Sequence, residues 1–211
     1  MSSTAARTRF RIALAIAAVG LAIVAAAIIG TFAAQPASSA AGALSDILPG
    51  GHAGDASGDR AMTEDDGVMP DGVDLADHRH AGIANLDPAL LEALRDAAAD
   101  ATDDGIEFVI NGGWRSPEYQ DRLLREAIST YGSAEEARRW VATPETSAHV
   151  SGDAVDIGPF DATAWLSANG AGYGLCQIYV NEPWHYELLP EAVDDGCPVM
   201  YTDPTQDPRM Q

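Results

Sequence analysis

Residues 147–156 combine a histidine, a glycine and a carboxylate at a spacing that suits a metal site. Residues 154–157 are predicted to form a strand, so Asp156 points away from the face shared by its two apolar neighbours. His149 lies seven residues earlier, and Gly152 permits a turn between them. Such a pair often occurs without a metal, so these two residues alone define only a candidate.

A second segment, Glu182-Pro183-Trp184-His185, places a carboxylate three residues before a histidine. The two can supply a metal ligand and, beside it, a base that takes a proton from water. On a plain strand they would face opposite sides, so Pro183 predicts a turn or bulge that re-aims one of them. The alternative is an edge strand with Glu182 in solvent and His185 packed on Trp184.

A third segment, residues 113–120, is a predicted strand-to-helix loop with the sequence GWRSPEYQ. Loops held on rigid elements are where substrate-binding side chains concentrate, which makes Arg115 a candidate for that role. The alternative is an ordinary guanidinium on the surface.

In this order, the patterns GWRSxxxQ, SxHxxGxAxD and ExxH resemble those of the VanY-type D-alanyl-D-alanine carboxypeptidases. That family is part of a wider metallopeptidase group, which includes lysostaphin-like enzymes and the zinc-bearing signalling domain of hedgehog proteins. The resemblance covers roughly residues 73–200. It implies a zinc carboxypeptidase that acts on peptidoglycan stem peptides.

The resemblance also implies roles for single residues. Three positions match the zinc ligands of the family: His149, Asp156 and His185. A zinc ion with three protein ligands keeps its fourth position for water, as in catalytic sites. Glu182 matches the general base, and Arg115 matches an arginine that holds a substrate oxygen or steadies developing negative charge. Ser147 and Gln120 match positions of the substrate-side lining.

Several activities on the same wall peptides stay open: an L,D-carboxypeptidase, a D,D-dipeptidase or an endopeptidase of peptide crosslinks. The rival from another class is a non-catalytic zinc module that binds the wall. The presence of Glu182 favours an enzyme, because a binding module needs no base. Glu187 departs from the family pattern, where many relatives carry a basic or neutral residue, and an acid there can change which peptide is accepted.

The elements that must position these residues are short helices mixed with short strands, without a regular β-α-β repeat. This pattern predicts an α+β fold, with a small antiparallel sheet and flanking short helices around the zinc site. Helix starts are predicted at Asp87-Pro88, Ser116-Pro117, Ser133 and Asp161. Strands are predicted at residues 107–111, 154–157, 177–180 and 185–188.

An apolar run precedes this domain. Residues 12–34 carry no charge and would span roughly 34 Å as a helix, enough to cross a bilayer core of about 30 Å. Three arginines in residues 1–11 predict a cytoplasmic flank, which places the rest outside the cell membrane. We expect a single-pass transmembrane anchor, a flexible stalk at 35–72 and a peptidase domain at 73–211; the alternative is secretion after signal cleavage.

The net charge of −20 argues against nucleic-acid binding, because such a surface repels phosphate backbones. The expected partners are a stem peptide and, through residues 12–34, the membrane; no oligomeric state follows from the sequence. Cys176 and Cys197 are the two cysteines, and in an exported domain an isolated pair most simply forms a disulfide. A zinc-thiolate site is the alternative. His78 and His80 form a His-x-His pair beside a polar segment, which we interpret as no metal site.

Overall fold

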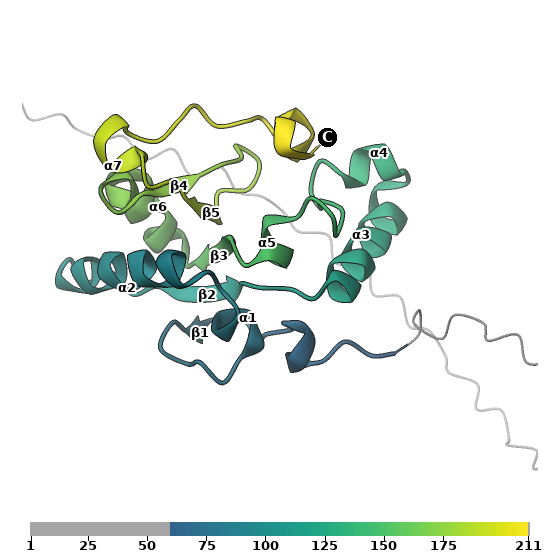
Figure 1. The fold of residues 1–211 in the computed structure, drawn as a ribbon, viewed down its shortest axis with the longest axis horizontal. Coiled ribbons are helices and arrows are strands. Elements are labelled where there is room, and N and C mark those ends of the chain that lie inside the picture. The colour runs from purple at the N-terminus through teal and green to yellow at the C-terminus, as the bar shows by residue number, and fades with distance from the viewer. Residues whose placement is uncertain (1–59, 211) are drawn as a thin grey trace, which may run out of the picture. The chain divides into compact units, whose positions relative to one another are not determined.

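A five-stranded antiparallel sheet organises residues 60–210, which are the residues that the computed structural model describes (Figure 1). The order across the sheet is β1-β2-β3-β5-β4, so β3 is the central strand. This arrangement confirms the predicted α+β class with a small antiparallel sheet. The strands are β1 (Val73–Asp74), β2 (Val109–Gly112), β3 (Ala154–Gly158), β4 (Leu175–Gln177) and β5 (His185–Leu188).

Two long helices and several short ones surround the sheet. The α-helices are α1 (Ala81–Ala84), α2 (Pro88–Asp103), α3 (Pro117–Tyr131), α4 (Ala134–Ala137), α5 (Ala148–Ser151), α6 (Phe160–Asn169) and α7 (Ala192–Asp195). Short 3-10 turns are η2 (Glu64–Asp66), η3 (Gly170–Tyr173), η4 (Pro204–Gln206) and η5 (Pro208–Met210).

The long helices begin where the sequence predicts. The Asp87 side chain accepts hydrogen bonds from the first-turn amides of α2, and Ser116 accepts one from the Tyr119 amide of α3. Each cap is followed by a proline, whose missing N–H would have had no helical partner. The predicted cap at Asp161 is wrong: the cap position is Pro159, two residues earlier, α6 starts at Phe160, and Asp161 lies in its first turn.

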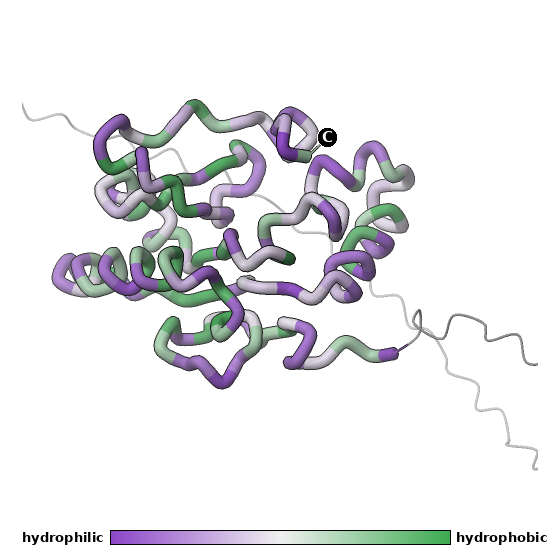
Figure 2. The backbone as a smooth tube through the Cα atoms, viewed as in Figure 1, coloured by the Kyte–Doolittle hydropathy of each residue, from purple (hydrophilic) through white to green (hydrophobic). Residues whose placement is uncertain are grey.

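The core lies between α2, α6 and one face of the sheet. Leu90 and Leu94 of α2 pack in one cluster with Val155 and Ile157 of β3 and Tyr186 of β5. Figure 2 shows hydrophobic colour along parts of β2 and β3, and α2 alternates between hydrophobic and hydrophilic colour. Alternation along β3 and β5 then directs Asp156 and His185 to the opposite face, as predicted for Asp156.

Two strand predictions need correction. β2 starts at Val109 rather than Glu107 and continues through Gly112, where it pairs with β3. β4 spans Leu175–Gln177 instead of 177–180, because those residues pair with β5, whereas Ile178 and Tyr179 turn into a second apolar cluster with Cys176 and Ala192. No pattern in the sequence indicated the two-residue β1 or the four-residue α5.

The folded region begins before Val73, within the expected stalk. Arg60 forms an ion pair with Asp66, which is only 4% exposed. The Ser116 amide donates to the Asp66 carbonyl oxygen at 2.9 Å. Residues 60–72 thus pack on the domain, while the rest of the expected stalk and the apolar run 12–34 lie outside the described residues. Within 60–210, no helix has the length and apolarity to cross a membrane.

Cys176 and Cys197 form the predicted disulfide, with their Cα atoms 5.5 Å apart. The bond ties β4 to the segment that follows α7. Since Cys176 is fully buried and β4 pairs with β5, the link fixes the outer edge of the sheet near the strand that carries His185.

Candidate metal centre

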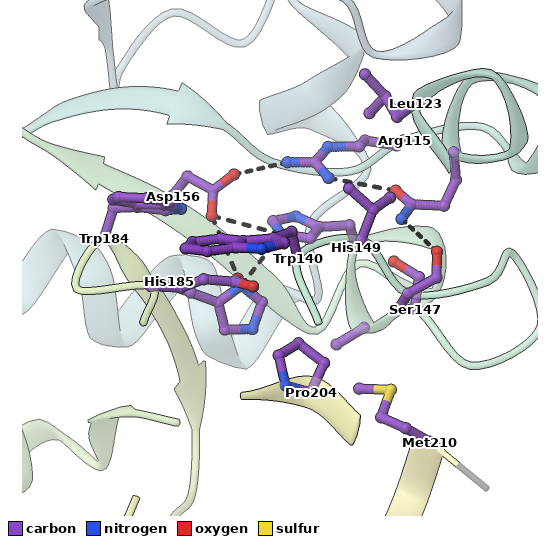
Figure 3. A pocket seen from close by; sticks show the side chains of 15 residues that line it. Arg115, Leu123, Trp140, Ser147, His149, Asp156, Trp184, His185, Pro204 and Met210 are labelled. Atoms are coloured by element: carbon purple, nitrogen blue, oxygen red, sulfur yellow. Dashed lines mark hydrogen bonds and ion pairs between the residues drawn. The ribbon is translucent and has the colours of Figure 1, made fainter. Parts of the chain in front are cut away.

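Three elements bring His149, Asp156 and His185 together. Asp156 and His185 face each other as direct partners of the β3–β5 pair. His149 comes from α5, which Gly152 ends with a positive φ of 85°. The Gly152 carbonyl oxygen accepts a hydrogen bond from the Asp87 amide at 2.9 Å, which joins the end of α5 to the start of α2. Figure 3 shows the Asp156 carboxylate between Arg115 and the two imidazoles.

The three side chains direct one atom each at a common point. His149 Nε2 lies 3.2 Å from His185 Nδ1 and 3.4 Å from Asp156 Oδ1, and His185 Nδ1 lies 3.6 Å from the same oxygen. All three residues are buried. Among the described residues, the ligand atoms of these three side chains are close enough to hold one metal ion. His78 and His80 are not part of this cluster.

The outer hydrogen bonds of the two rings show that this point suits a cation. His149 Nδ1 bonds the Gly113 carbonyl oxygen at 2.9 Å, and His185 Nε2 bonds Glu187 Oε1 at 3.3 Å. Both partners are acceptors, so these nitrogens carry hydrogens, and the other two nitrogens face each other at 3.2 Å, where a proton or a metal ion can lie between them. Asp156 Oδ1 is buried there without a hydrogen-bond partner among the described residues. Two imidazole nitrogens and one carboxylate oxygen are a donor set of catalytic zinc.

The pKa values reflect the same crowding. Burial lowers the pKa of His149, and the nearby Arg115 guanidinium lowers it further. Burial opposes ionisation of Asp156, but the two imidazoles and Arg115 outweigh it and hold the pKa well below its usual range. For His185, burial lowers the pKa, but the nearby carboxylates of Asp156 and Glu187 outweigh it and raise the pKa to about 9. A proton or a metal ion between these three side chains would therefore balance the negative charge of Asp156.

Glu182 lies beside the three ligand candidates. The His185 amide donates to the Glu182 carbonyl at 3.1 Å, which forms the turn predicted at Pro183. This turn brings Glu182 Oε2 within 3.8 Å of His185 Nδ1. The residue is only 7% exposed, so the alternative of a solvent-facing Glu182 is wrong. Burial raises its pKa to about 7.

Arg115 contacts the cluster directly instead of lying on the surface. Its Nη2 donates to Asp156 Oδ2 at 2.6 Å, and its Nη1 donates to Gln120 Oε1 at 3.2 Å. Gln120 is 1% exposed and donates in turn to the Ala142 carbonyl. Two of the five guanidinium donors are thus used within the domain, and the group still lines the adjacent pocket.

A pocket of about 250 Å³ opens over the cluster, and every predicted site residue except the two cysteines lines it. Ser147 Oγ and Glu182 Oε1 are buried in this lining without a hydrogen-bond partner among the described residues. Unsatisfied buried polar atoms are costly, so their gathering here indicates a place for a polar ligand. Eight more residues line the pocket and were not predicted for it, among them Trp140, Trp184, Pro204 and Met210.

Glu187 takes a different place from the one expected. It is 3% exposed, does not line the pocket and contacts His185 from the side away from the cluster. Glu187 therefore has no direct contact with the pocket, and its effect on which peptide is accepted stays a prediction. The two-residue period of β5, which puts 185 and 187 on one face, could have indicated this position.

Gly112 is required by the geometry of the cluster. It pairs with Asp156 across β2 and β3, and a Cβ atom added to it would lie 2.4 Å from Asp156 Oδ2. We expect Gly112→Ala to displace the carboxylate and to weaken metal binding by about tenfold or more. Gly172→Ala is the matched control, because its Cβ would meet nothing within 4 Å. Titration of both variants with zinc measures the effect, and equal affinities would contradict it.

Known proteins resemble this chain over the same region. A family model described as VanY, D-alanyl-D-alanine carboxypeptidase, matches residues 83–191. A D-alanyl-D-alanine carboxypeptidase of Enterococcus faecalis (strain ATCC 700802 / V583) is 31% identical over 129 residues, which are 49% of this chain and 48% of that protein. The match thus spans about half the length of that relative.

Two solved structures are similar to part of this chain. The LdcB LD-carboxypeptidase has a TM-score of 0.50 and 23% identity, over 63% of this chain and 74% of that chain. This likeness concerns the fold alone. A mutant of a vancomycin resistance D,D-pentapeptidase, VanY, in complex with Zn(II) has a TM-score of 0.48 and 26% identity, over 53% of this chain and 80% of that chain.

Proposed function

Because the chain belongs to the VanY family of D-alanyl-D-alanine carboxypeptidases, we propose that it is a zinc-dependent carboxypeptidase that hydrolyses the terminal D-Ala-D-Ala bond of peptidoglycan stem peptides. The observation that carries this proposal is the meeting of two imidazole nitrogens and Asp156 Oδ1 beside the buried Glu182. A wall-binding zinc module would need the two imidazoles and Asp156 to hold the metal, but it would not need Glu182.

The zinc ion would be held by His149, Asp156 and His185. When bound, a zinc ion with three protein ligands activates water at neutral pH and polarises a peptide carbonyl. The protein keeps the imidazoles in the required tautomers through the Gly113 carbonyl and Glu187. Arg115 donates to the second oxygen of Asp156, which leaves the first oxygen facing the two imidazoles, where it would be a ligand.

Glu182 serves as general base and then as general acid. It takes a proton from the attacking water as the water oxygen bonds to the carbonyl carbon. It passes that proton to the amine nitrogen as the C–N bond breaks, so that free D-alanine leaves. A general base is most effective when its pKa lies near the working pH, and burial raises the pKa of Glu182 to about 7.

The other lining groups bind the substrate. Arg115 has donors left for a substrate oxygen, where it would anchor the terminal carboxylate or steady the negative charge of the tetrahedral intermediate. Ser147 Oγ lacks a partner among the described residues of the same pocket and would bond the peptide backbone. Gln120 contributes indirectly, because its side-chain oxygen accepts a hydrogen bond from Arg115 and so orients the guanidinium.

The location outside the membrane is part of this proposal and is supported by the sequence. Arginines precede the uncharged run 12–34, and the first acidic residue of the chain follows it. An anchor or a cleaved signal in this run would bring the domain to the side where peptidoglycan lies. The disulfide of Cys176 and Cys197 fits an oxidising compartment.

A comparison of two peptides tests the proposed bond. We expect the domain to release free D-alanine from a stem pentapeptide that ends in D-Ala-D-Ala. Amidation of its terminal carboxylate should slow cleavage by about 10- to 150-fold, because a charged hydrogen bond contributes roughly 1.5–3 kcal/mol. Mass analysis of the products over time provides the measurement.

Other products would assign other activities. Equal cleavage of the amidated peptide would indicate an endopeptidase. Release of intact D-Ala-D-Ala would indicate a D,D-dipeptidase, and cleavage of the tetrapeptide alone would indicate an L,D-carboxypeptidase. Zinc binding without cleavage of any peptide would identify a non-catalytic wall-binding module.

A further inference from the structure

Glu187 connects the candidate metal centre to a segment far along the chain. Its Oε1 lies 3.3 Å from His185 Nε2. Its two oxygens accept hydrogen bonds from Arg209, at 2.5 Å from Nη1 and 3.3 Å from Nη2. Glu187 is 3% exposed, so Arg209 supplies the positive charge that offsets the burial of this carboxylate.

Arg209 is itself fixed by a second buried acid. Its Nε and Nη2 atoms donate to Asp207, which is fully buried and also accepts a hydrogen bond from the Tyr179 hydroxyl at 3.0 Å. The guanidinium thus bridges two carboxylates in a fixed orientation. A lysine would keep the charge but lose this fork-shaped geometry.

The segment that carries Arg209 lies outside the region matched by the family model, which ends at residue 191. We call residues 203–210 the closing segment. It is tied to the domain a second time, where Arg139 donates to the buried Asp203 at 3.1 Å. Pro204 and Met210 of the closing segment line the pocket over the metal centre.

We infer that Arg209 is a positioning residue, which acts through Glu187 to set the ring orientation and tautomer of His185. The inference rests on the proposed zinc site. Metal-binding histidines commonly donate their second N–H to a carboxylate, and loss of such a partner lowers metal affinity by about 10- to 100-fold. Without Arg209, the buried Glu187 would lose its charge partner and turn towards water, away from the imidazole.

Zinc affinity, measured by competition with a coloured chelator, tests this role in four proteins. We expect Arg209→Gln to bind zinc about 10- to 100-fold more weakly than the unaltered chain, and Arg209→Lys to recover part of that loss. Arg139→Gln is the matched control: it removes a separate ion pair of the closing segment, with Asp203, but leaves Glu187 and Arg209 in place. Its affinity should change by less than about threefold.

Three outcomes would overturn the inference: unchanged affinity in Arg209→Gln, an equal loss in Arg139→Gln, or no recovery in Arg209→Lys. Near-ultraviolet circular dichroism checks that each variant folds. If Arg209→Gln does not fold, the loss in Arg209→Lys relative to Arg139→Gln decides the matter.

A second measurement separates this inference from the proposed function. Nitrogen-15 NMR of the imidazoles in the metal-free protein should show a hydrogen on His185 Nε2, where the ring faces Glu187, and Arg209→Lys should shift the signal of this nitrogen. The signal does not depend on zinc. Absence of zinc binding in the unaltered chain would refute the metal site, whereas an unshifted imidazole signal would refute the role of Arg209.

Discussion

Replacing Glu182 by glutamine is expected to lower kcat for D-alanine release by about 10²- to 10⁴-fold. Glutamine keeps the shape of the side chain but cannot take a proton from the attacking water. Zinc content should stay at that of the unaltered chain, because Glu182 is a neighbour of the ligand candidates and not one of the three. Single-turnover assays with the stem pentapeptide, together with metal analysis, provide both values.

Glu191→Gln is the control for this variant, since Glu191 is exposed and lies away from the pocket lining. It should retain full activity. Substantial hydrolysis by Glu182→Gln would mean that another group takes the proton. A loss of zinc in that variant would instead make Glu182 part of the metal site.

Replacing His149 by alanine is expected to remove the metal and the activity with it. The purified unaltered domain should contain about one zinc per chain, as a site with three protein ligands holds one ion. His149→Ala leaves two ligands and a gap at the centre of the cluster, so the zinc content should fall towards zero. Elemental analysis after dialysis measures it.

His78→Ala is the matched control, because His78 is a histidine outside the cluster. Its zinc content should equal that of the unaltered domain. If His149→Ala retains zinc, or if His78→Ala loses it, the metal binds at a different site from the one proposed. Loss of the near-ultraviolet signal in His149→Ala would show unfolding, and His185→Ala then replaces it in the comparison.

The sequence predicted those parts of the fold that local chemistry determines. The starts of α2 and α3 follow from Asp87-Pro88 and Ser116-Pro117, where a side-chain oxygen and a proline act within one turn of chain. The orientation of Asp156 follows in the same way from the two-residue period of a strand. The turn at Pro183 was also predictable, because two residues of one motif had to reach one site.

Features that depend on distant contacts were not predictable from the sequence. β4 lies two residues earlier than expected, because its position is set by pairing with β5 and not by its own apolar residues. The position of Glu187 needed both the alternation along β5 and Arg209, which comes 22 residues later. The resemblance supplied the candidate ligands, but the tautomers that make them fit a cation came only from contacts such as His149 with Gly113.

The packing of residues 60–67 determines where the protein can be shortened. Asp66 accepts two hydrogen bonds from Ser116, one from the amide and one, at 3.3 Å, from the hydroxyl. Ser116 directly follows Arg115, which donates to Asp156. Gly67 lies so close to the Trp114 carbonyl that a Cβ atom would be 2.1 Å from it. A fragment that starts at Val73 would remove this support from the α3 start. An expression fragment that starts at or before Arg60 keeps the support and the Arg60–Asp66 ion pair with it.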